Sequence, residues 1–117
     1  MKAQKYSFNQ TKKIGFGTKV IYKYPTPTRD LDIGVMVVNG RHPEDPQTFI
    51  LEHECQFVMY VTKGSGKVYA GEELFDVQEK DVIFIPSLTK FAVEGILEYV
   101  TVDSPAFFPE QSEEIKV

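Results

Sequence analysis

The sequence predicts an all-β fold, and two observations carry this prediction. Aromatic and β-branched residues gather in short runs in which apolar and polar positions alternate, a pattern typical of half-buried strands. Turn-forming residues separate these runs at intervals of roughly 8–12 residues, as in sandwiches and barrels. A length of 117 residues allows one domain with a real core. A helix is expected only near the end of the chain, over residues 110–115.

The first half of the chain predicts two long strands. Residues 31–38 place Leu31, Ile33, Val35 and Val37 on one face, and the pair Asn39-Gly40 ends this strand in a turn. Residues 49–62 form the next strand. One of its faces is expected to carry Leu51, His53, Cys55, Phe57, Met59 and Val61, and the other Glu52, Glu54, Gln56 and Tyr60.

The second half predicts shorter strands joined by turns. Gly64 and Gly66 are expected to make a tight turn. A hairpin then joins residues 67–70 to residues 74–77 around Gly71. Further strands are expected over residues 82–85, 91–93 and 97–102. Residues 22–28, with two prolines, are expected to be extended at an edge.

The composition of the chain limits the kinds of binding partner and the cellular compartment that we expect. The formal net charge of −4 and scattered basic residues argue against nucleic acid, which needs a concentrated basic face. No apolar run approaches the roughly 20 residues that span a bilayer, so no membrane partner is expected. The polar first ten residues lack the apolar core of a signal peptide. The single cysteine, Cys55, fits a reducing compartment, and a cytoplasmic location is expected.

Two segments resemble the signature regions of a known family, the cupins. From Tyr60 the chain continues Tyr-Val-Thr-Lys-Gly-Ser-Gly, and from Asp81 it continues Asp-Val-Ile-Phe-Ile-Pro. The resemblance covers roughly residues 31–110. It implies a cupin-type double-stranded β-barrel, jelly-roll-like, of six to eight strands, with a short C-terminal helix or tail.

The same resemblance implies the organisation of the chain. Residues 1–117 would form a single cupin-like domain, with an N-terminal strand arm at 1–30, a barrel at about 31–105 and a tail at 106–117. It also implies a homodimer, because small cupins pair through sheet edges and exchanged N-terminal strands.

The residues that hold a metal in cupins are mostly replaced here. Aligned on Gly64 and Pro86, the family's ligand positions fall on Leu51, His53, Phe57 and Phe91. Leucine and phenylalanine offer no donor atom, so neither a metal nor another cofactor is expected. With only two histidines and one cysteine, a three-histidine site or a cysteine-based zinc site is excluded. Glu52 or Glu54 could rescue a metal site only if a bulge turned them inward, or if a partner chain contributed.

The predicted ligand pocket consists of the residues on the inward face, with His53 as the candidate catalytic group. Its members are Leu51, His53, Cys55, Phe57, Met59 and Phe91. Each polar member has an ordinary alternative: His53 as a hydrogen-bonded core histidine, and Cys55 as a small buried hydrophobe. His42 is expected in solvent, and Glu52 and Glu54 on a solvated or interface-facing surface. Tyr60, Tyr69 and Tyr99 are expected to pack in the fold, or else to line a pocket or an interface.

Three functions remain open from the sequence. The first is a cupin-fold protein without the metal site that binds a small molecule, a sugar or an acidic metabolite, in the barrel mouth. The second is a metal-independent isomerase or epimerase of the sugar type that uses His53 and a tyrosine. The third is a structural or regulatory dimer without a ligand. A second titrating group close to His53 would favour the enzyme.

Overall fold

The computed structural model describes all 117 residues and confirms the all-β prediction. Nine strands form one antiparallel sheet, and the only helical elements are two turns of 3-10 helix. The strands are β1 (Lys12–Phe16), β2 (Lys19–Lys23), β3 (Asp32–His42), β4 (Thr48–Glu52), β5 (Gln56–Ala70), β6 (Glu73–Gln78), β7 (Val82–Ile85), β8 (Phe91–Ser104) and β9 (Ser112–Lys116). The 3-10 turns are η1 (Phe8–Gln10) and η2 (Pro109–Gln111).

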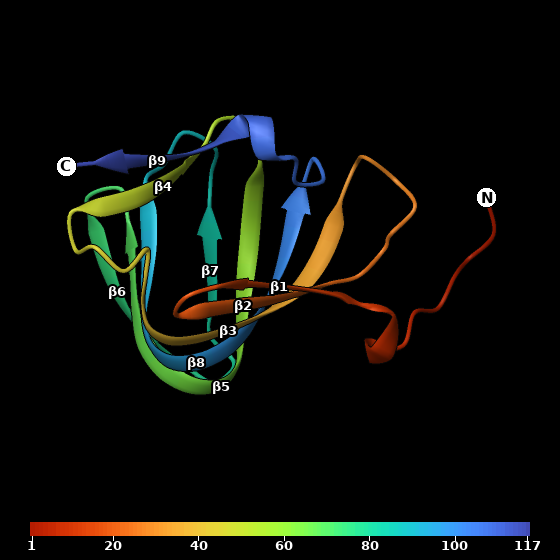
Figure 1. The fold of residues 1–117 in the computed structure, drawn as a ribbon, viewed down its shortest axis with the longest axis horizontal. Helices are drawn as coiled ribbons and strands as arrows, with labels where there is room; N and C mark the ends of the chain where they lie inside the picture. Colours follow the sequence, from red (N-terminus) through yellow and green to blue (C-terminus); the bar gives the residue numbers. More distant parts are fainter.

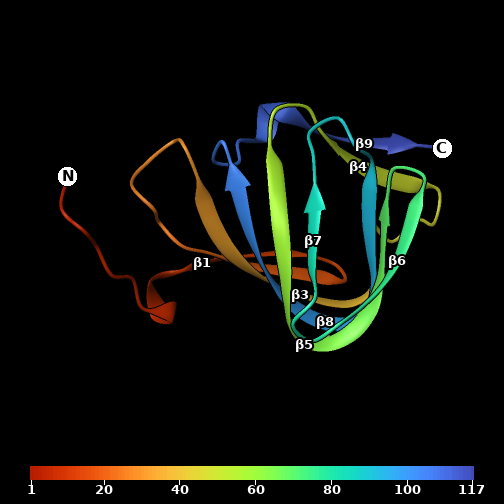
Figure 2. The ribbon, with the colours of Figure 1, turned by 180° about the vertical axis from the view of Figure 1, so that it is seen from behind.

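The sheet curls around a central strand, β8, into a half-open barrel (Figure 1). On one side β8 pairs with β3 along the whole of β3, and β2 and β1 follow in order. On the other side β8 pairs with β5 along nearly its full length. The first part of β5 carries β7 and its last part carries β6, as Figure 2 shows from behind. The long strands β3, β5 and β8 therefore form the curved wall.

Gly64 and Gly66 do not form the predicted tight turn; they lie within β5, where it bends against β8. A Cβ on Gly64 would stand 2.1 Å from the carbonyl oxygen of Ile96, and one on Gly66 would stand 2.2 Å from that of Glu94. A register shift between Val61 and Lys63 marks a bulge at the same bend. The glycines therefore serve a close approach of two backbones. The hairpin at Gly71 is confirmed, since Ala70 pairs with Glu73.

The helix predicted over residues 110–115 is wrong. The chain makes one 3-10 turn, η2, and then continues as β9, which pairs with β4 along all five residues. Together β4 and β9 cross one end of the barrel (Figure 1). We call this pair the β4–β9 flap. It meets the long strands at only one paired position, Ile50 with Phe91 of β8.

The face of β3 that is buried is the opposite of the predicted one. Met36 and Val38 point into the core, at 7% and 1% exposure, whereas Ile33, Val35 and Val37 are half-buried on the outer side. Alternation alone could not decide between the faces, because β3 has apolar side chains on both. The core itself is continuous across β3, β5, β6, β7 and β8, with Met59, Val61, Val68 and Ile85 fully enclosed. No helix here has the length and hydrophobicity needed to cross a bilayer.

Candidate ligand-binding cavity

A cavity of about 620 Å³ lies between the concave side of the curled sheet and the β4–β9 flap. Its volume is in the range of small-molecule sites, which are usually about 300–1,000 Å³. It is lined by side chains from seven of the nine strands and from the loop before β9. They are Ile14, Phe16, Lys19, Ile21, Lys23, Met36, His42, Ile50, Glu52, Phe57, Met59, Phe91, Val93, Tyr99, Thr101, Asp103, Phe107, Pro109, Ser112 and Glu114.

One wall of the cavity is apolar and aromatic. The rings of Phe57 and Phe91 meet edge to face, with centroids 5.0 Å apart. Met59, on the same face of β5 as Phe57, is fully buried, and Ile50 of the flap adds to the same lining. The sequence prediction placed Phe57, Met59 and Phe91 in the pocket, and all three line the cavity. In an edge-to-face pair the rings leave an aromatic face free, against which an apolar ring of a ligand can pack.

The adjoining part of the lining is a polar wall, because successive inward positions of β8 carry Tyr99, Thr101 and Asp103, and Thr101 and Asp103 pair with Met59 and Phe57 of β5. Residues two apart on a strand share a face, so these three side chains form a row. No fully buried side-chain nitrogen or oxygen lacks a hydrogen-bond partner. The polar atoms of this row that are not bonded within the chain therefore face the cavity and can bond a ligand.

Burial, and secondarily the nearby Asp32 carboxylate, raise the pKa of Asp103 to about 7. Asp32 is held differently: its carboxylate lies 2.6 Å from Lys23 Nζ and accepts a hydrogen bond from the Phe107 backbone N–H at 2.8 Å. Asp103 faces Asp32 across the β3–β8 pairing. The cavity therefore contains a carboxyl group that gains and loses a proton near neutral pH.

Two basic side chains line the cavity from β2 and from the end of β3. Burial lowers the pKa of Lys19 to about 8, although Glu52 and Asp103 oppose the shift. Burial, with the positive charges of Lys19 and Arg41, lowers the pKa of His42 to about 4. His42 was expected in solvent, and that expectation is wrong: it ends β3 and lines the cavity, with the Phe16 ring centroid 6.0 Å away. At neutral pH its imidazole is uncharged and can accept a hydrogen bond.

A break between β4 and β5 brings Glu52 into the cavity. The sequence predicted one continuous strand over residues 49–62, but residues 53–55 leave the sheet. Gln111 holds this break: its Nε2 donates to Glu52 Oε2 at 2.6 Å, and its Oε1 accepts from the backbone N–H groups of Glu54 and Cys55 at 3.1 Å each. Glu52 is 9% exposed. The expectation that Glu52 lies on a solvated or interface-facing surface is therefore wrong.

The same break moves His53 out of the predicted pocket. Its side chain is 45% exposed, and its Nε2 lies 2.5 Å from Glu113 on β9. Leu51 pairs with Glu113 and lies on the same outer side of the flap. Neither residue lines the cavity. The prediction that Leu51 and His53 line the pocket was wrong. The alternation of inward and outward side chains does not continue through residues 53–55, where the chain leaves the sheet.

Cys55 is buried as expected, at 1% exposure, but it too lies outside the cavity lining. Its thiol points toward the loop after β8 and lies 3.3 Å from the carbonyl oxygen of Pro105. Burial raises the pKa of Cys55 to about 12, and the carboxylates of Asp103 and Glu52 add to the shift. The thiol therefore stays protonated at neutral pH, which removes its nucleophilicity.

The polar wall had a signal in the sequence that the strand assignments missed. From Leu97 onward the odd positions carry Tyr99, Thr101 and Asp103, which is unusual for a barrel interior and marks a polar lining. Lys19 and Lys23 likewise share one face of a strand. The inward turn of Glu52 had no such signal, because His53, Glu54 and Cys55 include neither glycine nor proline.

The metal that cupins bind does not fit the residues present here. Leu51 and His53 lie on the outer side of the flap, and Phe57 and Phe91 present carbon atoms only. No group of three or more His, Cys, Asp or Glu side chains is arranged to hold a metal ion.

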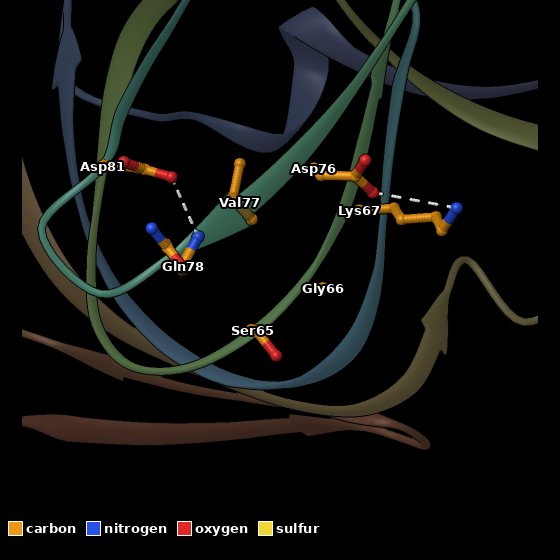
Figure 3. A pocket seen from close by; sticks show the side chains of 7 residues that line it. All are labelled: Ser65, Gly66, Lys67, Asp76, Val77, Gln78 and Asp81. Carbon is orange, nitrogen blue, oxygen red and sulfur yellow. Dashed lines mark hydrogen bonds and ion pairs between the residues drawn. The ribbon is translucent and has the colours of Figure 1, made fainter.

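A second hollow lies on the β5–β6 hairpin and is almost entirely polar (Figure 3). Lys67 and Asp76 face each other there at 3.7 Å, both well exposed, and Gln78 donates its backbone N–H to Asp81 at 2.9 Å. Only Val77 among its lining residues is apolar. Solvated charges of this kind offer little to hold a ligand, so the interior cavity is the better candidate site.

No protein-family model matches the sequence, and no curated protein does. Solved structures do match. Pac13 from Streptomyces, in a variant with uridine, has a TM-score of 0.87 at 17% identity, over 98% of this chain and 92% of that one. Another structure of Pac13, described as a nucleoside dehydratase, has a TM-score of 0.87 at 18% identity.

Oxalate decarboxylase from Bacillus subtilis also matches, with a TM-score of 0.72 at 18% identity, over 90% of this chain and 30% of that one. At these identities the likeness concerns the fold alone. The fold is the cupin-type barrel, as predicted from the two signature-like segments.

Proposed function

We propose that this protein binds a small, uncharged molecule that combines hydroxyl groups with an apolar ring, such as a nucleoside, in the cavity under the β4–β9 flap. The observation that carries the proposal is that the cavity combines an aromatic lining with an adjoining row of hydrogen-bonding groups. Phe57 and Phe91 offer aromatic rings, and Tyr99, Thr101 and Asp103 offer hydrogen-bonding groups beside them. Pac13, which has the same fold, has been solved with uridine.

The charges of the lining favour a neutral ligand over the acidic metabolite that the sequence left open. Glu52, Asp103 and Glu114 line the cavity, against Lys19 and Lys23. Lys23 is already paired with Asp32 at 2.6 Å. An anionic ligand would therefore meet carboxylates with only Lys19 left to neutralise it, and like charges at short range are unfavourable.

Uridine is the first probe, and thermal shift followed by calorimetric titration is the measurement. Tyr99→Phe removes one hydroxyl from the polar wall, and we expect it to weaken uridine binding about tenfold, the effect of losing one hydrogen bond. Tyr60→Phe is the matched control, since Tyr60 is 42% exposed on the outside of the barrel. Uridine 5′-monophosphate should bind more weakly than uridine. If neither nucleosides nor free sugars shift the melting temperature at millimolar concentration, the proposal is wrong.

A second candidate is a metal-independent acid–base enzyme, and the observation favouring it is the pair Asp103 and Lys19. Both line one cavity, and their pKa values of about 7 and about 8 suit a general base and a general acid near neutral pH. Isomerisation, epimerisation and dehydration can each begin with removal of a C–H proton beside a carbonyl. Because His53 lies outside the cavity, this candidate depends on Asp103, Lys19 and His42 instead.

Deuterium exchange tests the enzyme directly. Sugars with an aldehyde or ketone group, and nucleosides whose sugar has been oxidised to an aldehyde or ketone, should gain deuterium at the carbon next to the carbonyl, or lose water, when incubated with the protein in D₂O and followed by NMR. Asp103→Asn should abolish this exchange while uridine still raises the melting temperature. Exchange that persists in Asp103→Asn would exclude Asp103 as the base.

Two further parts of the proposal concern the cellular location and the oligomeric state of the protein. A cytoplasmic location is supported by the single cysteine, which is unpaired and buried. A homodimer is supported by the resemblance to small cupins, and by an exposed apolar face of the sheet. Without a ligand, this homodimer would be the structural or regulatory dimer that the sequence left as the third function.

A further inference from the structure

Lys19 brings a primary amine to the cavity from β2, and its stem lies between apolar side chains. Phe16 on β1 and Val38 on β3 are its direct partners in the sheet. Paired residues of antiparallel strands lie side by side on one face, so these two side chains flank the methylene groups of Lys19. Val38 belongs to the buried core, and Phe16 lines the cavity. The amine therefore reaches the cavity through apolar surroundings.

The Nζ atom of Lys19 has no polar partner within the chain. The ion pairs of the protein are made by other side chains, and Lys19 donates no side-chain hydrogen bond. Every fully buried side-chain nitrogen does have a partner, so the unpaired Nζ is not enclosed by protein atoms. Because Lys19 lines the cavity, its amine is open to a ligand there.

Lys23, two residues further along β2, provides the contrast. It lines the same cavity, but its Nζ lies 2.6 Å from the Asp32 carboxylate. Lys19 has no such ion pair, and burial lowers its pKa to about 8 against the opposing charges of Glu52 and Asp103. Roughly one Lys19 side chain in ten is then a free amine at pH 7, against fewer than about one in a thousand for an ordinary lysine. A free amine in apolar surroundings is a nucleophile.

We propose that Lys19 forms an imine with an aldehyde or ketone group of the ligand. The amine nitrogen attacks the carbonyl carbon, and the electrons of the C=O double bond move to the oxygen. The resulting carbinolamine loses that oxygen as water, which takes up both hydrogens of the amine, while the C–N bond becomes C=N. The step is reversible and needs no oxidant or reductant. It rests on the cavity being the ligand site proposed above, but not on the ligand being a nucleoside.

Two other groups of the lining can carry the protons of this step. The charge of Asp103 acts on the pKa of Lys19, and the charge of Lys19 acts on the pKa of His42, so all three groups influence one another across the cavity. The uncharged His42 can accept a proton from the attacking nitrogen, and the Asp103 carboxyl can give one to the departing hydroxyl group. A protonated imine also withdraws electrons from the neighbouring carbon. It would therefore ease the proton removal that the second candidate function assigns to Asp103.

Reductive trapping tests the proposal on the wild-type protein. Propanal and sodium cyanoborohydride at pH 7 convert an imine into a stable secondary amine, and mass spectrometry of the digested protein locates it. We expect Lys19 to be labelled at least tenfold faster than the exposed Lys12 and than the ion-paired Lys23. The labelling rate of Lys19 should level off above about pH 8, whereas that of Lys12 should still rise. Lys19→Arg keeps the charge and should lose the fast labelling, and Lys12→Arg is the matched control.

The outcomes separate this proposal from the binding of nucleosides. Labelling of Lys19 no faster than that of Lys12 would overturn the imine, and a uridine thermal shift in the same protein would leave the proposed binding function in place. Fast labelling without a uridine thermal shift would support the imine and contradict the nucleoside. If both are right, saturating uridine should slow the labelling of Lys19 at least fivefold, because it occupies the cavity, and leave that of Lys12 unchanged.

Discussion

The side chain of Gln111 joins Glu52 to the break between β4 and β5: its Nε2 donates to Glu52 Oε2 at 2.6 Å, while its Oε1 accepts from two backbone N–H groups. Gln111 is only 3% exposed, so these bonds are made away from water. They hold residues 53–55, the segment at which the alternation of inward and outward side chains shifts between β4 and β5. The position of Glu52 in the cavity therefore depends on a residue almost 60 positions later in the chain.

We predict that Gln111→Ala lowers the free energy of unfolding by about 3 kcal/mol, because buried hydrogen-bonding groups lose their partners. Urea unfolding measures this. Gln56→Ala, at an exposed position of β5, is the control and should change stability by less than about 0.5 kcal/mol. Equal effects of the two substitutions would show that the bonds to Gln111 contribute little.

We predict that Gly64→Ala destabilises the fold by more than about 2 kcal/mol or prevents folding. Gly64 has a φ of +80°, and an added Cβ would meet the Ile96 carbonyl oxygen at 2.1 Å. Gly15→Ala is the matched control, because a Cβ there meets nothing within 4 Å. Thermal unfolding of both variants is the measurement. A Gly64→Ala protein as stable as Gly15→Ala would mean that β5 and β8 approach less closely at the bend.

We predict that Asp103→Asn stabilises the protein at high pH only. The folded state raises the pKa of Asp103 from 3.8 to about 7. Between these values the folded state binds more protons than the unfolded chain, so the contribution of Asp103 to stability falls as the pH rises. The free-energy cost of ionising the buried Asp103 carboxyl is complete above pH 7 and absent below about pH 4.

The expected gain for Asp103→Asn is about 2 kcal/mol at pH 8, half of what the full shift would give at about 1.4 kcal/mol per unit. Urea unfolding at pH 4 and pH 8 measures it. Asp30→Asn, at an exposed carboxyl, controls for the loss of a charge. A gain that is the same at both pH values would indicate that Asp103 does not titrate within this window.

We predict that Cys55 reacts slowly with a thiol reagent in the native protein. The side chain is 1% exposed, and burial raises the pKa of its thiol to about 12. The thiolate that reacts is therefore scarce and shielded. Labelling at pH 7.5, followed by mass spectrometry, should be at least a hundredfold slower than in urea-unfolded protein. Native labelling at the unfolded rate would show that the loop at Pro105 opens readily.

The sequence by itself determined the fold class and most strands. Local alternation and turn residues were sufficient for strands such as β7 and for the hairpin at Gly71. The spacing from Gly64 and Pro86 assigned Phe57 and Phe91 to the pocket, and both side chains are buried and line the cavity, although a bulge separates Phe57 from Gly64 and a loop separates Phe91 from Pro86.

Only the tertiary structure decided which side of β3 faces the core and which polar residues meet in the cavity. β3 carries apolar side chains on both sides, so its sequence pattern alone does not show which side faces the core. The packing of β3 against the rest of the sheet decides this. The inward turn of Glu52, with His53 left outside, requires the bonds to Gln111, which come from the far end of the chain. Long-range contacts of this kind leave no periodic signal in the segment that they reshape.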